Sequence, residues 1–508
     1  MKNSSNNKTK MKKMKKSIFT VAAALFISSV MFAQLRPTDQ TGINMFETPK
    51  SDIQFIGPKV EFGASISMPY IALEQSNNAN PNNPAINPSA LFKNSPNFAL
   101  SMANLNINSY LADGITLQVS LYLASKHHNE TWVKGGYVQF DKIPFIKLDL
   151  LDNIMKYTSI KVGQMDVNYG DAHFRRSDGG NAIYNPFMEN YIMDEFATEI
   201  GAEADVNYNG IVGSFSVTNG NLNPSLAAID TAAVSVNSIY PSKPFKYATG
   251  HNPSFIAKLG FDKQITEKLR IRLTGSVYSN SGSLSNTLFG GDRTGSNYSA
   301  VMYNAAPGTG TAFNGRFNPG FSDKITTFMG NLFLKYKPLD WLAVESFTTA
   351  ESASGRTTYE AKDRKAQQIA TDLVLRFGKN ENFFAGVRYN TLTSTIAKSV
   401  VAPIAAKAAT TGTPASTKWL DDNDHSKGIY SYTPAVAATP ATPYIPGYFV
   451  DPYDTTIDRL AISAGWFVTK NIMAKVEYVK QQYSGFPVGN IYNGAQFHGL
   501  SAEAVISF

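Results

Sequence analysis

The feature that most constrains this chain is the way short and long connections alternate between stretches of period-two sequence. Sixteen stretches alternate apolar and polar residues with varying clarity, which is the pattern of a half-buried β-strand. Tight turns such as Asp113-Gly114 and Asn209-Gly210 join successive pairs, and most intervening connections are long. The exceptions are a short connection at 126–130 and a longer one at 141–156. The expected strands are residues 59–70, 99–111, 115–123, 132–140, 157–169, 198–208, 211–218, 255–261, 269–278, 326–337, 342–350, 369–377, 383–392, 459–468, 472–481 and 497–508.

This asymmetry predicts an all-β fold, a transmembrane antiparallel up-and-down barrel. Such barrels have short periplasmic turns, long extracellular loops and an even number of strands. A soluble sandwich has no reason to separate its connections by length in this way. We therefore expect about 16 strands, within a range of 14–18.

The last strand, residues 497–508, strengthens this interpretation. His498, Leu500, Ala502, Ala504, Ile506 and Phe508 fall on one face of an extended chain. A closing barrel strand needs such a lipid-facing row, and a terminal aromatic suits the membrane interface. A strand of a soluble sandwich would show the same alternation, so this stretch alone leaves both folds open.

The amino-terminal residues 1–33 read as a secretory signal peptide. Seven lysines and no acid precede a short apolar run, and cleavage is expected near Ala33 or Gln34. The alternative is an uncleaved anchor. The chain has 46 basic and 39 acidic residues, a net charge of +7, so removing the seven lysines leaves equal numbers of both. The excess charge thus belongs to the export signal, and we expect no nucleic-acid partner.

Composition excludes several other classes. The chain has no Cys, which rules out a lipid-anchored lipoprotein, a disulfide and a zinc–thiolate site. After the signal no apolar run approaches the length of a membrane helix. Aromatic residues make up 12% of the chain, which suits strands and interfacial girdles. We expect no cofactor and no metal.

The faces opposite the apolar rows carry charges of both signs. Such residues are costly in a dry core, whereas a water-filled lumen accepts them. The alternative is the solvated outer face of a soluble protein. The residues that we expect to form the pore wall are Glu199, Glu203, Lys258, Arg270, Arg272, Arg376, Arg388 and Lys475.

The third outer loop, residues 170–195, is the best candidate for a pore constriction. It mixes aromatics with paired arginines and several acids, and a loop that folds into the lumen needs both kinds of residue. The alternatives are an outer cap of the barrel and a contact between subunits. The residues expected to act at the constriction are Asp171, His173, Arg175, Arg176, Asp178 and Glu189.

Two other polar clusters are weaker candidates. His127-His128 lies in a short loop and reads as a surface pair rather than a metal site. Residues 421–424, Asp-Asp-Asn-Asp, have oxygen ligands that suit Ca²⁺ but lack the spacing of an EF-hand. A solvated loop is the favoured interpretation of both.

The mature chain resembles the outer-membrane porins of the Bacteroidota. The resemblance rests on Phe32-Ala33-Gln34 at the end of the signal, on FFAGVRYNTL at 383–392 and on the last strand. It implies a Gram-negative outer membrane with its lipopolysaccharide, passive diffusion of small hydrophilic solutes and, in many relatives, a homotrimer. Some relatives prefer phosphate and other anions, which the arginines fit and the acids of strand 198–208 oppose. The last strand also resembles the signal read by the barrel-assembly machinery, with Phe508 as its terminal aromatic.

The expected organisation is a signal peptide at 1–33, a periplasmic amino-terminal segment at 34–58 and the barrel at 59–508. Two rivals to a porin remain. A plugged structural or secretion-associated barrel differs from a porin in conductance. A barrel enzyme would need a cluster of Ser, His and Asp or Glu near the outer rim, and none can be assembled from the sequence.

Overall fold

The computed structural model describes most of the chain after residue 35. The described ranges are 36–48, 50, 55–79, 89–91, 93–99, 101–123, 131–177, 180–195, 197–222, 252–283, 286–290, 301–302, 315–357, 362–396, 399–401, 416–419, 430–433, 448–450 and 452–508. The expected signal peptide, His127, His128, Asp178 and residues 421–424 lie outside these ranges.

Sixteen long strands of the described residues form one antiparallel barrel, as the sequence predicts. Each strand pairs with the next along the chain, which is the up-and-down topology. They are β1 (Lys59–Ser76), β3 (Met102–Ala112), β4 (Ile115–Leu123), β5 (Trp132–Phe140), β6 (Thr158–Asp166), β7 (Thr198–Tyr208), β8 (Ile211–Thr218), β9 (Ser254–Thr266), β10 (Leu269–Asn280), β11 (Lys324–Leu339), β12 (Leu342–Arg356), β13 (Arg364–Phe377), β14 (Phe383–Ile396), β19 (Tyr453–Thr469), β20 (Ile472–Ser484) and β21 (Gln496–Ser507).

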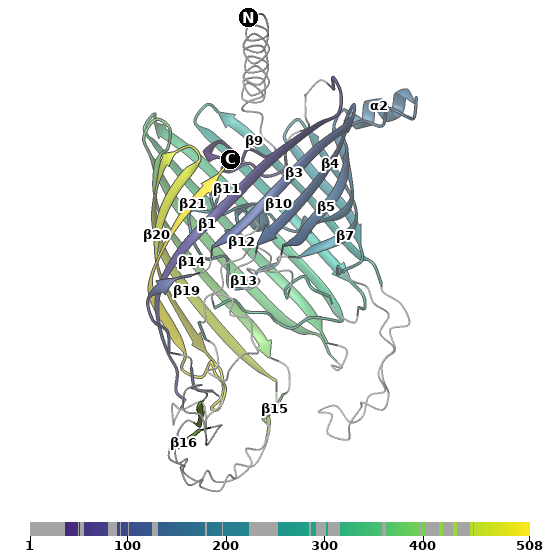
Figure 1. The fold of residues 1–508 in the computed structure, drawn as a ribbon. Helices are drawn as coiled ribbons and strands as arrows, with labels where there is room; N and C mark the ends of the chain where they lie inside the picture. The colour runs from purple at the N-terminus through teal and green to yellow at the C-terminus, as the bar shows by residue number, and fades with distance from the viewer. Residues whose placement is uncertain are drawn as a thin grey trace, which may run out of the picture.

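The barrel closes between its first and last strands. β1 pairs with β21 from Ser65 opposite Ser507 to Ser76 opposite Gln496. The carboxy-terminal Phe508 continues this ladder, because its backbone exchanges two hydrogen bonds of 2.9 Å with Ala64. Phe508 therefore lies at the rim that carries the short turns between β7 and β8, β11 and β12, and β19 and β20 (Figure 1).

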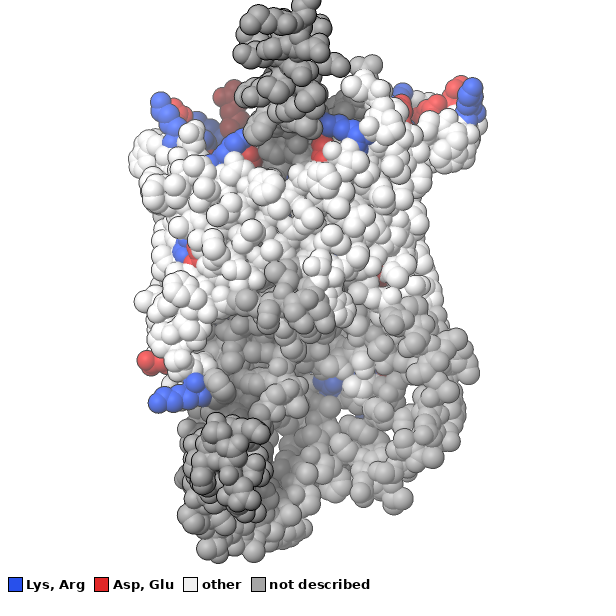
Figure 2. Space-filling model, viewed as in Figure 1, with Lys and Arg blue, Asp and Glu red and all other residues white. Residues whose placement is uncertain are grey.

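The two faces of each strand divide as the alternation predicts. β20 alternates strictly between exposed and buried residues over its whole length. The face seen in Figure 2 is a broad uncharged belt, with its charged side chains mainly at the two rims. Large aromatic side chains are exposed around the short-turn rim, as in an interfacial girdle; they include Tyr208, Tyr336, Trp341, Phe383, Trp466 and Phe508.

The structure departs from the sequence expectation mainly at the strand ends. β12 runs to Arg356 and β11 to Leu339, because hydrogen bonding continues at the rims after the apolar alternation stops. β6 ends at Asp166 instead of residue 169, and the chain then turns into the barrel. The longer connection at 141–157 contains a short helix, α2 (Asp149–Met155). No helix among the described residues is long and apolar enough to cross a membrane.

Smaller elements lie between the long strands. β2 (Asn97–Phe98) pairs with β1. β15 (Ser399–Val401) pairs with β18 (Tyr448–Val450), and β16 (Ser416–Trp419) pairs with β17 (Tyr430–Thr433). Two 3-10 turns, η1 (Gln40–Gly42) and η2 (Ala172–Arg175), belong to segments inside the barrel.

Candidate functional site: the segments inside the barrel

The connection from β6 to β7 runs inside the barrel and is buried there. Tyr169, Ile183, Phe187, Ile192 and Met193 are each 1% exposed or less. We call the described residues 167–177 and 180–195 the inward loop. Only one 3-10 turn, η2, and a few isolated turns satisfy backbone groups within this loop, so most of its amides and carbonyls need partners from elsewhere.

Polar side chains of the wall supply those partners. Asn390 and Gln368 accept hydrogen bonds from the backbone amides of Ile192 and Met193, at 2.7 and 2.8 Å. Glu477 accepts one from Met188 at 2.8 Å. In this part of the barrel the inner polar face therefore binds an irregular segment of backbone.

Cationic wall residues bind the carbonyls of the same loop. Lys475 donates to the carbonyls of Ala182, Asn185 and Phe187 at 3.0–3.1 Å. Arg388 donates to the Glu189 carbonyl and Arg459 to the Asn190 carbonyl, both at 2.7 Å. The Arg388 guanidinium also lies 4.2 Å from the ring centre of Phe187, which adds a cation–π contact.

A charged cluster fixes the start of the inward loop. Asp171 is fully buried and accepts hydrogen bonds from Arg272 at 2.7 and 2.8 Å and from Thr274 at 2.6 Å. Lys258 lies 3.2 Å from the same carboxylate. Burial alone would raise the pKa of Asp171, but Lys258 and Arg272 outweigh burial and hold that pKa well below its usual range.

The amino-terminal residues 36–48 also lie inside the barrel. The expected place of residues 34–58 was the periplasm, whereas Glu47 binds Arg272 at 2.6 and 2.7 Å on the inner wall. Asn44 donates to Glu345 at 2.5 Å and accepts from Arg175 of the inward loop at 2.7 Å. We call residues 36–48 the N-terminal strap.

Aromatic and backbone contacts also hold the N-terminal strap in place. Phe46 packs edge-on against Phe174 of the inward loop, with ring centres 5.8 Å apart, and against Phe333 of the wall at 5.3 Å. At the short-turn rim, the Gln40 amide donates to the Lys470 carbonyl at 2.8 Å. The strap thus bridges the rim, the inner wall and the inward loop.

Five of the six predicted constriction residues, all except Asp178, are described by the structure, and they fall in this packed interior. Arg176 lies 2.9 Å from Asp194, which also binds Arg316 at 2.7 Å. Arg175 is 4.0 Å from Asp372. The side chain of Glu189 is also buried. The loop arginines therefore sit among carboxylates.

His173 stacks near Phe174, with ring centres 3.9 Å apart. Burial, reinforced by Lys258, lowers the pKa of His173 well below its usual value, so the ring is neutral at neutral pH. The structure brings His173 together with Asp171, Arg175, Arg176 and Glu189 in one loop inside the barrel.

The eight predicted wall residues all lie on the inner face. Each cationic wall residue forms an ion pair with a carboxylate. Arg270 pairs with Asp262 at 2.7 Å, and Arg388 pairs with Asp372 at 2.6 Å. Arg376 lies 2.9 Å from Glu345, and Lys475 lies 2.9 Å from Glu503. Of the two acids, Glu203 binds Lys161 at 2.9 Å, and Glu199 accepts hydrogen bonds from Thr218 and Tyr278.

Sequence reasoning missed the strap residues Asn44 and Glu47, because the segment that carries them has no period of either strand or helix. It also missed Glu345 and Arg459, although both occupy inner positions of strands that the alternation located. Within the described residues no group of three or more His, Cys, Asp or Glu is placed to hold a metal ion.

A closed sixteen-stranded antiparallel barrel with an apolar outer belt and a polar inner face defines the class: an outer-membrane-type β-barrel. No protein-family model matches the chain, and no curated protein matches it. Its assignment to this class rests on its own strand pairing.

Solved structures with a similar course of the chain are outer-membrane barrels. An anion-selective porin from Comamonas acidovorans is 7% identical, with a TM-score of 0.43 over 89% of this chain and 100% of that one. The outer-membrane channel DcaP of Acinetobacter baumannii is 11% identical, with a TM-score of 0.43 over 90% and 99%. OmpT, an outer-membrane protein of Vibrio cholerae, is 9% identical, with a TM-score of 0.42 over 90% and 99%.

Proposed function

We propose that the protein is a porin-like channel of a Gram-negative outer membrane, through which small hydrophilic solutes diffuse past a narrow constriction. The observation that carries this proposal is the docking of the inward loop on the charged inner wall. A barrel of about 16 strands has room for an aqueous channel, and a segment fixed across it limits what can pass. The constriction in this proposal is built from the inward loop and the wall residues that hold it.

The pairing of charges supports a weak ion preference. Arg176 with Asp194, Arg388 with Asp372 and Arg376 with Glu345 each place a cation beside a carboxylate. Paired charges cancel much of each other's field at the position of a passing ion. The anion preference implied by the resemblance therefore has less support than a channel that discriminates mainly by size.

A second candidate is a barrel that is closed at rest. The N-terminal strap favours it, because Glu47 and Asn44 bind the inner wall and the inward loop at the same time. Two segments that cross one lumen leave less room than one. In this candidate, solutes pass only when the strap or the loop is released.

Recording from the purified mature protein in planar bilayers separates the two candidates. The porin-like channel gives steady single-channel steps, and proteoliposomes swell in small sugars but not in large ones. A closed barrel gives no steps until the strap is removed by deleting residues 36–48. Absence of conductance in both the intact and the strap-deleted protein would reject both forms of the proposal.

A further inference from the structure

The connection between β5 and β6 differs from other turns at the same rim. Its neighbours there are tight, such as Tyr208 to Ile211 and Leu339 to Leu342, whereas residues 141–157 form an insert that contains α2. The helix is amphipathic. Leu150, Leu151, Ile154 and Met155 share one face, and the opposite face carries Asp149, Asp152, Asn153 and Lys156.

Apolar side chains of the insert are as exposed as those on the outer face of the barrel. Phe145 is 67% exposed and Leu150 65%, and Ile146, Leu148 and Ile154 are each at least 46% exposed. Figure 1 shows α2 projecting sideways from the rim, away from the mouth of the barrel. Exposed apolar patches of this kind mark surfaces that are covered by a membrane or a partner.

The exposed patch is continuous with the aromatic girdle of the barrel. Phe145 meets Phe140, the last residue of β5, with ring centres 6.5 Å apart. At the other end of the insert, Tyr157 packs edge-on against Tyr208 at 4.7 Å. Aromatic residues at this level of an outer-membrane-type barrel lie at the boundary between headgroups and acyl chains.

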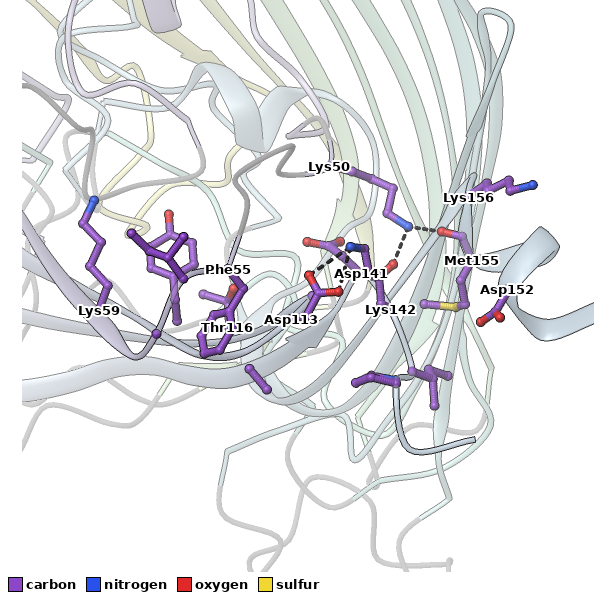
Figure 3. A pocket seen from close by; sticks show the side chains of 17 residues that line it. Lys50, Phe55, Lys59, Asp113, Thr116, Asp141, Lys142, Asp152, Met155 and Lys156 are labelled. Atoms are coloured by element: carbon purple, nitrogen blue, oxygen red, sulfur yellow. Dashed lines mark hydrogen bonds and ion pairs between the residues drawn. The ribbon is translucent and has the colours of Figure 1, made fainter. Parts of the chain in front are cut away.

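The base of the insert is firmly held. The ammonium group of Lys50 donates to the carbonyls of Asp141, at 2.7 Å, and Met155 (Figure 3). It also donates to the carbonyl of Thr158 at 2.7 Å. Lys142 binds Asp113 of the neighbouring turn at 2.9 Å. A hollow of about 800 Å³ lies beside this base, lined in part by Lys50, Tyr110 and Met155. The base therefore fixes the insert where it leaves the rim.

We propose that residues 143–156 form an interfacial anchor that lies in the phospholipid leaflet at the short-turn rim. The face with Leu150 and Ile154 enters the acyl boundary, and the face with Asp149, Asn153 and Lys156 remains in the headgroup layer. Amphipathic helices bind at this depth through buried apolar area, and lysines such as Lys147 and Lys156 are attracted to phosphate groups. Continuity with the girdle favours lipid over a protein partner as the occupant.

The absence of Cys from the chain allows a direct test with single cysteines. Four variants of the mature protein each carry one cysteine, in place of Leu150, Ile154, Asp149 or Asn153. Each cysteine is labelled with an environment-sensitive fluorophore, and the variant is folded into phosphatidylethanolamine–phosphatidylglycerol vesicles. Leu273→Cys, on the exposed outer face of β10, is the matched control for a lipid-facing site. Lipids brominated on their acyl chains then act as contact quenchers.

The proposal predicts that brominated lipid quenches labels at 150 and 154 nearly as strongly as at 273, and several-fold more than labels at 149 and 153. Equal, weak quenching at all four insert positions, with strong quenching at 273, would overturn the anchor. Quenching of the label at 150 that depends on protein density instead of brominated lipid would assign the patch to a second copy of the chain. Weak quenching at 273 as well would refute the membrane placement of the barrel itself.

Discussion

The guanidinium group of Arg272 grips the carboxylate of Asp171 with two hydrogen bonds, Nε to Oδ2 at 2.8 Å and Nη2 to Oδ1 at 2.7 Å. The outer edge of the same guanidinium binds both carboxylate oxygens of Glu47. One side chain of β10 thereby joins the wall, the inward loop and the N-terminal strap. Asp171 lies 101 residues and Glu47 lies 225 residues before Arg272 in the chain, so Arg272 couples two distant segments that lie inside the barrel.

Replacing Arg272 with Gln should release both segments. The change leaves the buried Asp171 with Lys258 as its cationic partner and Thr274 as a neutral donor, and breaking a buried pair in this way costs about 3–5 kcal/mol. We expect faster hydrogen exchange in residues 167–177 and a larger conductance. Arg356→Gln, which breaks half-exposed rim pairs with Asp323 and Asp363, is the control and should cost at most about 1 kcal/mol. Unchanged exchange in Arg272→Gln would contradict the coupling.

The docking of the inward loop should weaken as pH rises. Burial and the adjacent Glu351 raise the pKa of Glu195 well above its usual 4.5, and Tyr169 and Asp194 lie nearby. A carboxyl whose pKa is raised in the docked state favours docking at low pH. The stability of the docked state therefore declines from about pH 4.5 upward, because ionisation of Glu195 stabilises the released loop more than the docked loop. Conductance should therefore increase with pH above 4.5, and Glu195→Gln should flatten the curve; an equally steep curve in the variant would rule out this residue.

Changing both Arg175 and Arg176 to Gln should shift the reversal potential toward cations in a salt gradient. Two positive charges are lost, while Asp194 and Asp372 remain with Arg316 and Arg388 as their other partners. The fixed charge near the constriction then becomes more negative. The paired change of Lys263 and Lys268, exposed near the β9–β10 turn, is the control and should shift the potential little. An equal shift in both variants would place the loop arginines away from the ion path.

Phe508→Asp should sharply reduce the amount of folded barrel in the outer membrane. Phe508 is exposed at the rim and its backbone closes β1 to β21 through Ala64, so a charge there disturbs both the girdle and the closure. The readout is the fraction of heat-modifiable protein on a gel. Val488→Asp, in an exposed connection at the opposite rim, should fold normally. Normal folding of both variants would remove the assembly role of the last residue.

The strands were predictable from sequence because each β-strand must satisfy two environments at once. The alternation of Ile271 and Leu273 with Arg270 and Arg272 assigns β10 and its faces without further information. The rims were harder to predict, because Ser354 and Arg356 place polar residues on the outer face of β12, where the alternation would need apolar ones. The backbone pairing of β11 with β12 continues to Arg356, although the sequence there no longer alternates between apolar and polar residues.

The interior was less predictable, because it is held by contacts between side chains and irregular backbone. Asn390 lies on the polar face of its expected strand and Gln368 lies just before the expected strand 369–377, yet both accept hydrogen bonds from the amides of the inward loop, at Ile192 and Met193. Nothing local in the sequence marks Glu47 as the partner of Arg272, more than two hundred residues away. Spacing can assign a residue to a face, but it does not identify the segment that will cover that face.

The most direct test of the central claim is single-channel conductance in a deletion series. One variant lacks residues 172–185 of the inward loop, one lacks residues 36–48 of the strap, and one lacks both. The matched control shortens the connection at 402–446. We predict that each interior deletion raises conductance, that the double deletion raises it most and admits larger sugars, and that the control leaves it unchanged. Equal conductance in the intact protein and the double deletion would show that neither segment constricts the barrel.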